Sequence, residues 1–557
     1  MDVLKMPKID VSYKDLCSLI GRKISPEQIS DELLYAKSEL DGVDGDILKI
    51  DIKDTNRPDL WSAEGIAREI RARYRPGMPK YAVKKSGMSV IVDGSVNNVR
   101  PFTACAIVKG IRITSSVMSQ LLQLQEKVAG TFGRNRKEVA IGVYDLDKIK
   151  FPVTFKAMKP EDIRFVPLAS RDKMSAFDII KKHPKGKEFG HLLDGKGLCP
   201  VFADADEEIL SVPPIINSNH SGNVNENTKN LFIECSGFDL RFLNTALNVM
   251  VAALSERGGM LYSVNVMYGK KNIATPDLTP KSFSITVDYV NKISGLGLPA
   301  KDMSKLLEKS LYAPKISGKQ IDVLYPAYRQ DIMHERDVIE DIIISYGFNN
   351  VKPDSPKLIT KGKLTEKQAF IEKVTNIMTG AGFQEILSYT LTSADNLYAK
   401  MGTNGNAAEI ENPVSANWSV LRTWLLPGLL EFLGKNQHIE YPHDIFETGT
   451  CVLLANTETR SRDIPKLAAA VSASTVNYEA ISSTLDALFR NLGMKYILKA
   501  CVHPSFIEGR TAEIIVGNKV IGYVGEIHPQ VLNNWSLEKP VVAFEIGLEE
   551  IFSALNR

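Results

Sequence analysis

Four of the five carboxylates between positions 331 and 341 of the sequence could act together. Asp337, Glu340 and Asp341 are spaced at i, i+3 and i+4, so one face of a helix would carry all three, and Asp331 precedes them. Acids in the first turns of a helix favour the positive end of its dipole and can simply be solvated. Carboxylate oxygens are also the ligands that Mg²⁺ prefers in proteins. The spacing alone leaves both interpretations open.

A helix must position these acids. Glycine closes the last turn of a helix at little conformational cost, and Gly347 is placed to do so. Apolar residues before it recur at intervals of three and four, the period of one buried helix face. We therefore expect a helix within residues 328–348, with its buried face formed by Ile332, Val338, Ile339, Ile342 and Ile343.

Two segments in the middle of the chain combine small hydroxyl groups with apolar strands. SVPPIINS spans residues 211–218 and NLFIECSG spans residues 230–237, so Ser211 and Ser236 lie beside expected strand ends. Backbone amides would be available there, and a pocket of this kind can test a substrate for a hydroxyl group. Alternatively, the two serines only close turns.

The composition excludes several classes of protein. The chain has 557 residues, enough for about three to five domains, with 44% apolar and 24% charged residues. No apolar run approaches the roughly 18 residues that span a bilayer, and MDVLKMPKIDVSYKDL lacks the apolar core of a secretory signal. Six cysteines show no zinc-ligand spacing. We expect a cytoplasmic protein with free thiols and no membrane partner.

A net charge of +2 does not identify a nucleic-acid-binding protein, so local clusters must decide. A second helix is expected within residues 56–74, and its face opposite the apolar residues is basic. The basic cluster comprises Arg68, Arg71, Arg73, Arg75 and Lys80. These side chains could follow a phosphate backbone. They could equally be solvated or paired with acids.

Changes in pattern along the chain predict an α+β protein of four domains. Residues 1–86 form an amino-terminal domain. Residues 87–268 are β-rich, and residues 269–352 form a small helical, winged-helix-like module that holds the acidic helix. Residues 353–557 follow a Pro/Lys-rich linker and combine helices with mostly antiparallel strands.

Together these segments resemble the phenylalanyl-tRNA synthetase beta subunit of archaeal and eukaryotic type. The similarity rests on the run D-x5-D-x2-E-D followed by Y-G-F, on NRPDLWSAEGIARE, and on the two serine-bearing strings. It implies that an alpha subunit carries the synthetic site, and that two alpha and two beta chains join phenylalanine to its tRNA with ATP and Mg²⁺. It also implies that residues 269–352 are a module of the B5 type, with a magnesium site at the subunit junction whose ligands are Asp331, Asp337, Glu340 and Asp341.

The same resemblance gives residues 87–268 a hydrolytic role. They would form a tRNA-binding editing domain of the B3/B4 type, which removes tyrosine wrongly attached to the phenylalanine tRNA. Ser211, Glu234 and Ser236 would line its pocket, with Phe202 nearby. Glu234 departs from the family's pattern, because the family has an aspartate, one methylene shorter, at this position.

The last domain resembles the antiparallel core of class II synthetases, but it lacks residues that an active core needs. Such a core uses arginines to neutralise the phosphates of ATP. Neither DIFETGTCVLL, at residues 444–454, nor GYVGEIHPQVLNNW, at residues 522–535, contains one. The resemblance gives Arg422 and Arg510 structural roles, so we expect a catalytically inactive core.

Two other functions remain open at this point. A free-standing tRNA deacylase would need only the β-rich domain, and a scaffold could bind tRNA without any chemistry. A large inert core is better explained as an interface with a partner chain.

Overall fold

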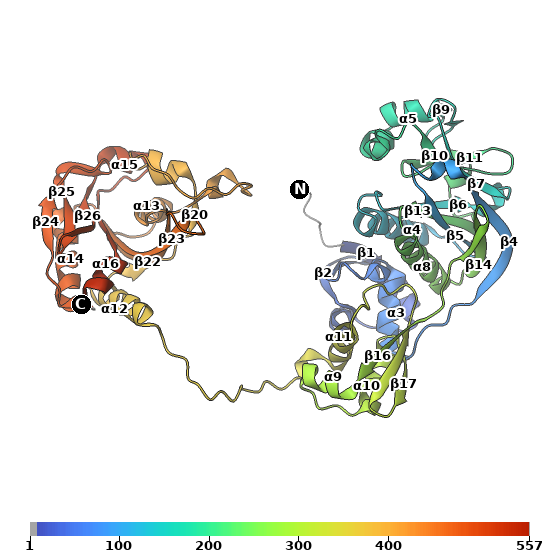
Figure 1. Cartoon of the computed structure of the whole chain (residues 1–557), viewed down its shortest axis with the longest axis horizontal. Coiled ribbons are helices and arrows are strands. Elements are labelled where there is room, and N and C mark those ends of the chain that lie inside the picture. The colour runs from blue at the N-terminus through green and yellow to red at the C-terminus, as the bar shows by residue number, and fades with distance from the viewer. Residues whose placement is uncertain (1–7, 556–557) are drawn as a thin grey trace. The chain divides into compact units, whose positions relative to one another are not determined.

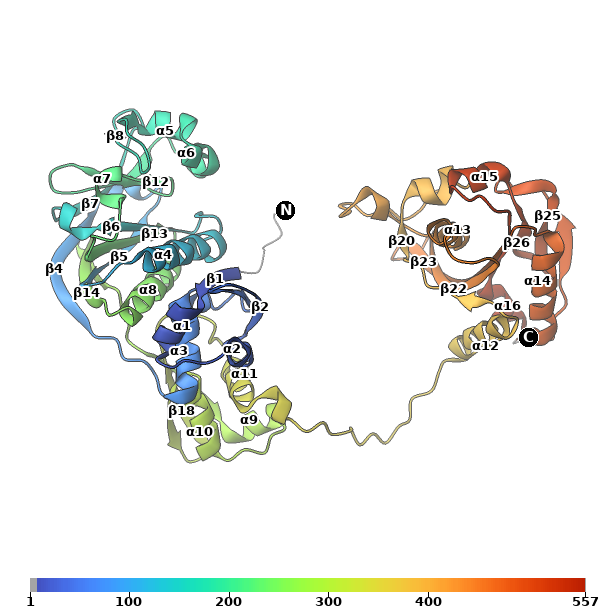
Figure 2. The same ribbon diagram turned by 180° about the vertical axis from the view of Figure 1, so that it is seen from behind.

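The computed structural model describes residues 8–555, and the chain divides into two compact units, Met1–Ser355 and Pro356–Arg557. Each unit mixes helices with sheets, which confirms the predicted α+β class (Figures 1 and 2). Residues 351–365, in the expected linker, form neither helix nor strand. Within residues 8–555, no helix is both long and apolar enough to cross a membrane.

The chain begins with a three-stranded antiparallel sheet of order β1-β3-β2, packed with three helices. Each helix starts after a serine whose side chain accepts a hydrogen bond from the first turn, namely Ser12, Ser25 and Ser62. The last helix is shorter than predicted, because residues 58–60 form a separate 3-10 turn. The elements are β1 (Lys8–Ser12), α1 (Tyr13–Ile20), α2 (Pro26–Leu33), β2 (Ser38–Asp44), β3 (Ile47–Ile52) and α3 (Ala63–Tyr74).

The β-rich segment forms a ten-stranded sheet of order β12-β11-β10-β7-β4-β14-β5-β13-β6, with β15 paired to β14. Its strands extend from residue 83 to residue 275, a few residues beyond the predicted range at both ends. The strands are β4 (Val83–Val92), β5 (Phe102–Lys109), β6 (Val139–Asp145), β7 (Val153–Met158), β10 (Cys199–Ala203), β11 (Ile209–Val212), β12 (Ile216–Asn217), β13 (Asn230–Gly237), β14 (Met260–Tyr268) and β15 (Lys271–Thr275).

Helix α8 packs against β5 and β13 of this sheet through an apolar face. A small two-stranded sheet and short helices extend from the other end of the domain (Figure 1). The α-helices and strands of this domain outside the ten-stranded sheet are α4 (Ser115–Lys127), β8 (Arg164–Phe165), β9 (Met174–Ser175), α5 (Ala176–Lys182), α6 (Pro184–Phe189), α7 (Asn219–Gly222) and α8 (Leu240–Glu256).

The module that follows packs three helices on a sheet of order β16-β18-β17. Its acidic helix covers Glu335–Tyr346 only, so the expected helix, which would have included Ile332 in its buried face, begins later than predicted. Ile332 lies before the helix and is buried all the same, while Gly347 ends the helix as expected, with φ 92°. The elements are β16 (Lys281–Thr286), α9 (Val287–Ser294), α10 (Ala300–Lys309), β17 (Ala313–Ser317), β18 (Gln320–Tyr325) and α11 (Glu335–Tyr346).

The second unit is built on a seven-stranded sheet of order β19-β22-β23-β27-β26-β25-β24, in which only the β19–β22 pair is parallel. Successive residues of β23 point to opposite faces of the sheet and belong to two apolar cores. Leu467 packs with α12, α14 and α16, and Ala468 packs with α13. The strands are β19 (Gln384–Glu385), β20 (Leu391–Thr392), β21 (Val420–Leu421), β22 (His443–Leu454), β23 (Ser461–Ser472), β24 (Ile497–Ala500), β25 (Phe506–Val516), β26 (Lys519–Ile527) and β27 (Val541–Gly547). The helices are α12 (Glu366–Gly380), α13 (Leu426–Lys435), α14 (Tyr478–Leu492), α15 (Pro529–Asn534) and α16 (Leu548–Leu555).

Gly65 allows α3 to approach the turn before it. A Cβ atom on this residue would overlap the backbone oxygen of Asp59. We expect Gly65→Ala to lower the free energy of unfolding of the first unit by about 1–3 kcal/mol, because the backbone of the turn must shift. Gly130→Ala is the matched control, since a Cβ atom there meets open space. Thermal unfolding measures both variants, and equal midpoints would contradict the prediction.

Candidate functional site

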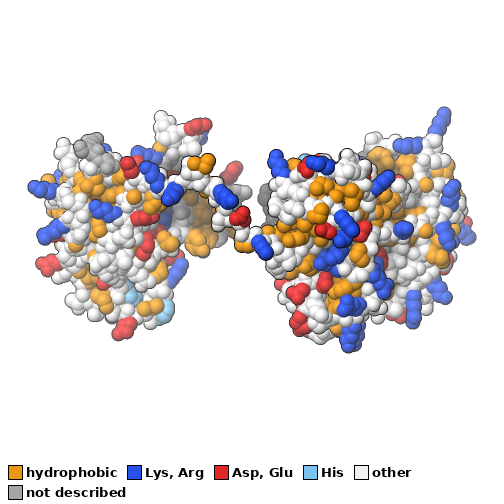
Figure 3. Space-filling model, turned by 90° about the horizontal axis from the view of Figure 1, so that it is seen from below, with side chains coloured by type: hydrophobic (Ala, Val, Ile, Leu, Met, Phe, Trp, Pro, Cys, Tyr) orange, Lys and Arg blue, Asp and Glu red, His pale blue; other side chains and the backbone are white. Residues whose placement is uncertain are grey.

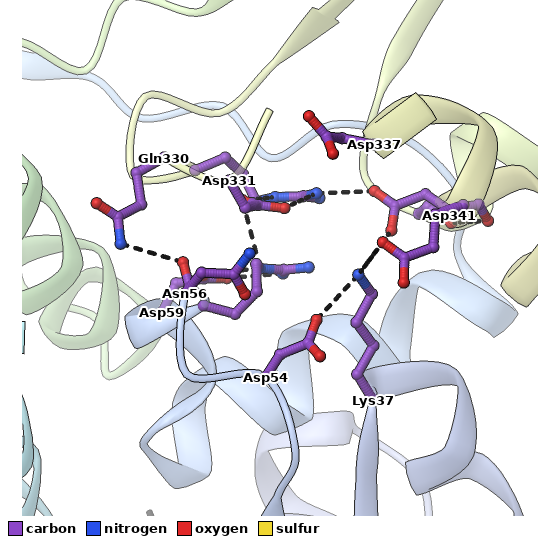
Figure 4. A network of polar contacts seen from close by, with 12 residues as sticks. Lys37, Asp54, Asn56, Asp59, Gln330, Asp331, Asp337 and Asp341 are labelled. Carbon is purple, nitrogen blue, oxygen red and sulfur yellow. Dashed lines mark hydrogen bonds and ion pairs between the residues drawn. The ribbon is translucent and has the colours of Figure 1, made fainter. Parts of the chain in front are cut away.

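The four acids predicted as magnesium ligands lie around the start of α11, and two of them share one arginine. Asp331 and Asp341 are buried. The Arg329 guanidinium donates from Nε to Asp331 Oδ1 over 2.7 Å and from Nη2 to Asp341 Oδ2 over 2.7 Å. Figure 4 shows both carboxylates within one network of polar contacts. A buried cation therefore already lies between them.

The other two acids have separate partners. Asp337 Oδ2 accepts hydrogen bonds from the backbone amides of Met333 and His334, at 2.8 and 2.7 Å, so this carboxylate caps the first turn of α11. In Figure 4 Asp337 lies apart from the dashed network. Glu340 is exposed and accepts a hydrogen bond from Lys37 Nζ over 3.1 Å.

Lys37 joins the acidic helix to the amino-terminal domain. Its Nζ lies 3.0 Å from Asp54 Oδ2 and 3.7 Å from Asp341 Oδ1. The Tyr312 hydroxyl also donates to Asp341 Oδ2 over 2.6 Å. Burial opposes ionisation of Asp341, but Arg329 and Lys37 outweigh it and hold the pKa of this carboxyl well below its usual range. Asp341 is therefore an anion in the folded protein.

The charged cluster continues into the helix predicted to have a basic face. Arg57 donates to Asp59 over 2.9 and 2.8 Å and to Glu69 over 2.6 Å, and all three side chains are buried. Arg68 is also buried, with its guanidinium 4.3 Å from the ring centroid of Tyr328. A phosphate contact by Arg68 is therefore wrong, because the side chain is enclosed between two domains.

The neighbouring arginines of α3 also have partners. Arg71 forms an ion pair with Glu256 at 2.5 Å, and the Arg73 guanidinium lies 3.5 Å from the ring centroid of Tyr35. The interpretation of this face as paired with other side chains is confirmed for Arg71. Figure 3 shows Lys and Arg side chains on the surface of both units, with Asp and Glu side chains between them.

The four acids do not form a magnesium ligand set as they lie. Among residues 8–555, no group of three or more His, Cys, Asp or Glu side chains is arranged to hold a metal ion. Arg329 and Lys37 neutralise the two buried carboxylates, Asp337 caps the helix, and Glu340 faces Lys37. The magnesium site stays a prediction.

A second polar cluster lies within the ten-stranded sheet, around Glu234 on β13. The Tyr144 hydroxyl, from β6, lies 2.7 Å from Ser211 Oγ on β11 and 3.2 Å from Glu234 Oε1. All three side chains are buried. The second carboxylate oxygen of Glu234, Oε2, is buried with no hydrogen-bond partner in the described protein. Burial raises the pKa of Glu234 to about 8, against the opposing charge of Arg100.

The register of the sheet explains how Glu234 fits. Glu234 pairs with Gly142 on β6, and a Cβ atom on Gly142 would lie 2.6 Å from Glu234 Oε1 and would overlap the Tyr144 hydroxyl. A glycine is therefore required where the carboxyl and the hydroxyl meet. Arg100 holds the next polar position of β13, because its Nε donates to Ser236 Oγ over 3.1 Å.

Ser211, Glu234 and Ser236, which the sequence singled out, thus belong to one sheet. Ser211 pairs across strands with Phe202, whose ring stacks on Phe155 at a centroid distance of 4.3 Å. Both serines lie within strands and are buried, so the alternative that they only close turns is wrong.

Sequence reasoning missed three members of this cluster: Arg100, Gly142 and Tyr144. Gly142 and Tyr144 share a face by the two-residue period of a strand, which was a readable signal within AIGVYDLDKI. No local pattern shows that β6 pairs with β13, because the two strands are far apart in sequence.

The two arginines of the second unit are held by acids. Arg422 is buried, and its Nη1 donates to Glu447 Oε1 over 2.6 Å. Arg510 forms an ion pair with Glu526 at 2.6 Å near the surface. These contacts give both side chains structural partners.

The contacts of Arg329 with two buried carboxylates can be tested by removing the guanidinium. Arg329→Leu leaves Asp331 and Asp341 buried without their guanidinium, so we expect the free energy of unfolding of the first unit to fall by about 3–5 kcal/mol. Arg336→Leu removes an exposed arginine of the same segment and should have little effect. Calorimetry of both variants, with and without Mg²⁺, measures the change in the free energy of unfolding. Equal stability of the two variants would contradict the buried-pair account.

Asp341 adds a pH dependence to this cluster. A depressed folded-state pKa contributes stability that is present above the unfolded pKa of about 3.9 and is lost as pH falls through the folded value. The deficit of Asp341→Asn relative to the parent should therefore be full at pH 7 and shrink below pH about 4. A deficit that does not change between pH 7 and pH 3 would contradict the low pKa.

Two family models match the chain. The model described as "Phenylalanyl tRNA synthetase beta chain CLM domain" matches residues 352–548, and the model described as "tRNA synthetase B5 domain" matches residues 283–348. The second match covers the three-stranded module with the acidic helix α11.

Full-length relatives and a solved structure agree with these matches. The phenylalanine–tRNA ligase beta subunit of Pyrococcus horikoshii is 47% identical over 555 residues, covering 98% of this chain and 100% of the relative. That of Methanocella arvoryzae is 38% identical over 552 residues, covering 98% and 99%. The crystal structure of an N-terminal fragment of the Pyrococcus horikoshii subunit covers 61% of this chain and all of the fragment, with 49% identity and a TM-score of 0.60. The chain therefore belongs to the family of phenylalanine–tRNA ligase beta subunits.

Proposed function

We propose that this chain assembles with an alpha subunit, two copies of each, into a cytoplasmic ligase that joins phenylalanine to its tRNA with ATP. The full-length similarity to phenylalanine–tRNA ligase beta subunits supports this assignment. In the proposal the alpha subunit carries the synthetic site, and the second unit of this chain is a class II core that lost its catalysis. Any magnesium ligands among Asp331, Asp337, Glu340 and Asp341 would be completed at the alpha subunit junction.

We further propose that the ten-stranded sheet domain hydrolyses tRNA that carries tyrosine. Phenylalanine and tyrosine differ by one hydroxyl group, and an apolar synthetic pocket rejects an added hydroxyl by only about a hundredfold. A second site that binds this hydroxyl by a hydrogen bond would remove the misacylated product. Such a site needs a buried polar atom that is left without a partner.

Glu234 Oε2 carries the proposal, because it is such an atom. A buried carboxylate oxygen without a partner costs free energy, which a hydrogen bond from the phenolic hydroxyl would recover. A phenylalanyl group has no donor to offer. The preference for tyrosine would therefore follow from the contact that only tyrosine can make.

Ser211 and Ser236 would hold the ester or orient a water molecule in this site. The water adds to the ester carbonyl, the bond from the carbonyl carbon to the ribose oxygen breaks, and a proton passes to that oxygen. No covalent enzyme intermediate is required. The domain would act on the product of the synthetic site before the tRNA is released for use.

Removing the acid should impair editing more than charging. We expect Glu234→Ala to leave phenylalanine transfer near the parental rate, while hydrolysis of tyrosyl-tRNA falls by on the order of tenfold to a thousandfold, or roughly 1.4–4 kcal/mol of transition-state stabilisation. Glu226→Ala, at an exposed position of the same domain, is the control. Hydrolysis of tyrosyl-tRNA at the parental rate by Glu234→Ala would show that the pocket is assigned to the wrong strand.

The second unit should not form an adenylate by itself. The strings at residues 444–454 and 522–535 lack arginine, and Arg422 is already bound to Glu447. The purified chain, free of any alpha subunit, should therefore show no phenylalanine-dependent exchange of pyrophosphate into ATP, whereas the complex with the alpha subunit should show it. Exchange by the isolated chain would overturn the proposal of an inactive core.

A further inference from the structure

Tyr144 occupies a position between the two groups that the proposed editing function uses. It lies on β6, fully buried, with its ring 5.8 Å from that of Phe232. Its hydroxyl is within hydrogen-bond distance of both Ser211 Oγ and Glu234 Oε1. Gly142, two residues earlier on the same strand, leaves the space in which these groups meet.

The Tyr144 hydroxyl has one proton for two partners. When Glu234 is ionised, its carboxylate can only accept, so Tyr144 donates to Glu234 and the Ser211 hydroxyl turns to donate to Tyr144. When Glu234 is protonated, the carboxyl can donate to the Tyr144 oxygen, and Tyr144 can then donate to Ser211. The direction of the Ser211 hydrogen bond therefore follows the charge of Glu234.

We propose that Tyr144 is a positioning residue of the editing site, which holds Glu234 Oε1 so that Oε2 stays free for the phenolic hydroxyl, and which couples this carboxyl to Ser211. The inference rests on the proposed function of the domain. It assigns the substrate contact to Glu234 and the orientation of Glu234 to Tyr144. The substrate class is a tRNA esterified with a 4-hydroxyphenyl amino acid.

The surroundings of Glu234 contain few other groups that could set its charge. Arg100 approaches from the segment before β5, Cys105 faces it from β5, and Tyr144 faces it from β6. Burial raises the pKa of Glu234 to about 8, while the charge of Arg100 and the hydroxyls of Tyr144 and Ser236 oppose that rise. Loss of the Tyr144 hydroxyl should therefore move the pKa of Glu234 further upward.

The test uses Tyr144→Phe in the complex with the alpha subunit, with single-turnover hydrolysis of tyrosyl-tRNA followed from pH 6 to 9. Spontaneous hydrolysis is subtracted at each pH. We expect the rate to fall by about tenfold to a hundredfold, since a misplaced group loses much of its effect. We also expect the apparent pKa of the profile to rise. Tyr268→Phe, which removes a half-buried hydroxyl bound to the backbone of Thr103 in the same sheet, should leave both the rate and the apparent pKa unchanged.

A double-mutant cycle separates positioning from a general loss of structure. If Tyr144 acts through Glu234, then Tyr144→Phe should change the rate by less than about twofold when Glu234→Ala is already present. Independent, multiplicative effects would overturn the proposal, as would a parental rate and pH profile in Tyr144→Phe alone. Should Tyr144→Phe fail to fold, Ser211→Ala replaces it: Ser211 is a partner of Tyr144 in both charge states of Glu234, so its loss should shift the apparent pKa, and an unchanged pKa would overturn the proposal.

The outcome for the parental complex keeps the two claims apart. If the parental complex does not hydrolyse tyrosyl-tRNA above the spontaneous rate, the proposed editing function fails, and Tyr144 has no role to test. If the parental complex hydrolyses tyrosyl-tRNA and Glu234→Ala does not, but Tyr144→Phe matches the parent, then the editing function stands and the positioning role of Tyr144 is refuted.

Discussion

Charges of both signs are buried together where the amino-terminal domain meets the module of residues 281–346. Arg57 and Arg68 come from the first, and Arg329 with Asp331 and Asp341 comes from the second. Each charge alone would be costly to bury, and joining the two parts pairs Arg57 and Arg329 with acids, although Arg68 keeps two nitrogens, Nε and Nη1, without a hydrogen-bond partner among the described residues. The position of α11, and with it that of the predicted magnesium ligands, depends on this junction. Asp331 and Asp341, which the sequence suggested as metal ligands, therefore already form ion pairs within the fold.

The same cost of burial applies to the second polar cluster, and there too it is not fully offset. Glu234 is surrounded by β5 and β6 and keeps one oxygen without a partner. A core built only for stability would replace such a carboxyl with an apolar side chain. We propose that a ligand supplies the missing donor. Gly142 supports this explanation, because a larger residue there would displace the carboxyl.

Local patterns predicted much of the fold, while the long-range contacts were out of reach. The period of α11 and its end at Gly347 were readable, and Ser211, Glu234 and Ser236 were selected by resemblance to a family. The helix start was misplaced because Ile332 continues the apolar period, although Arg329 and Asp331 hold this segment in an irregular conformation. Tyr144 and Arg100 could not be found, since only the sheet order brings them to Glu234. A phosphate contact by Arg68 failed as a possibility because a sequence does not show which part of a helix other elements will cover.

The central claim is that a buried carboxyl in this chain distinguishes tyrosine from phenylalanine on tRNA. The most direct measurement compares the single-turnover hydrolysis of tyrosyl-tRNA and phenylalanyl-tRNA by the parental complex, at one pH and with spontaneous hydrolysis subtracted. Satisfying a buried polar atom that otherwise has no hydrogen-bond partner is worth about 1–3 kcal/mol, so tyrosyl-tRNA should be hydrolysed about fivefold to a hundredfold faster. Equal rates for the two substrates, or no hydrolysis of either above the spontaneous rate, would contradict the account.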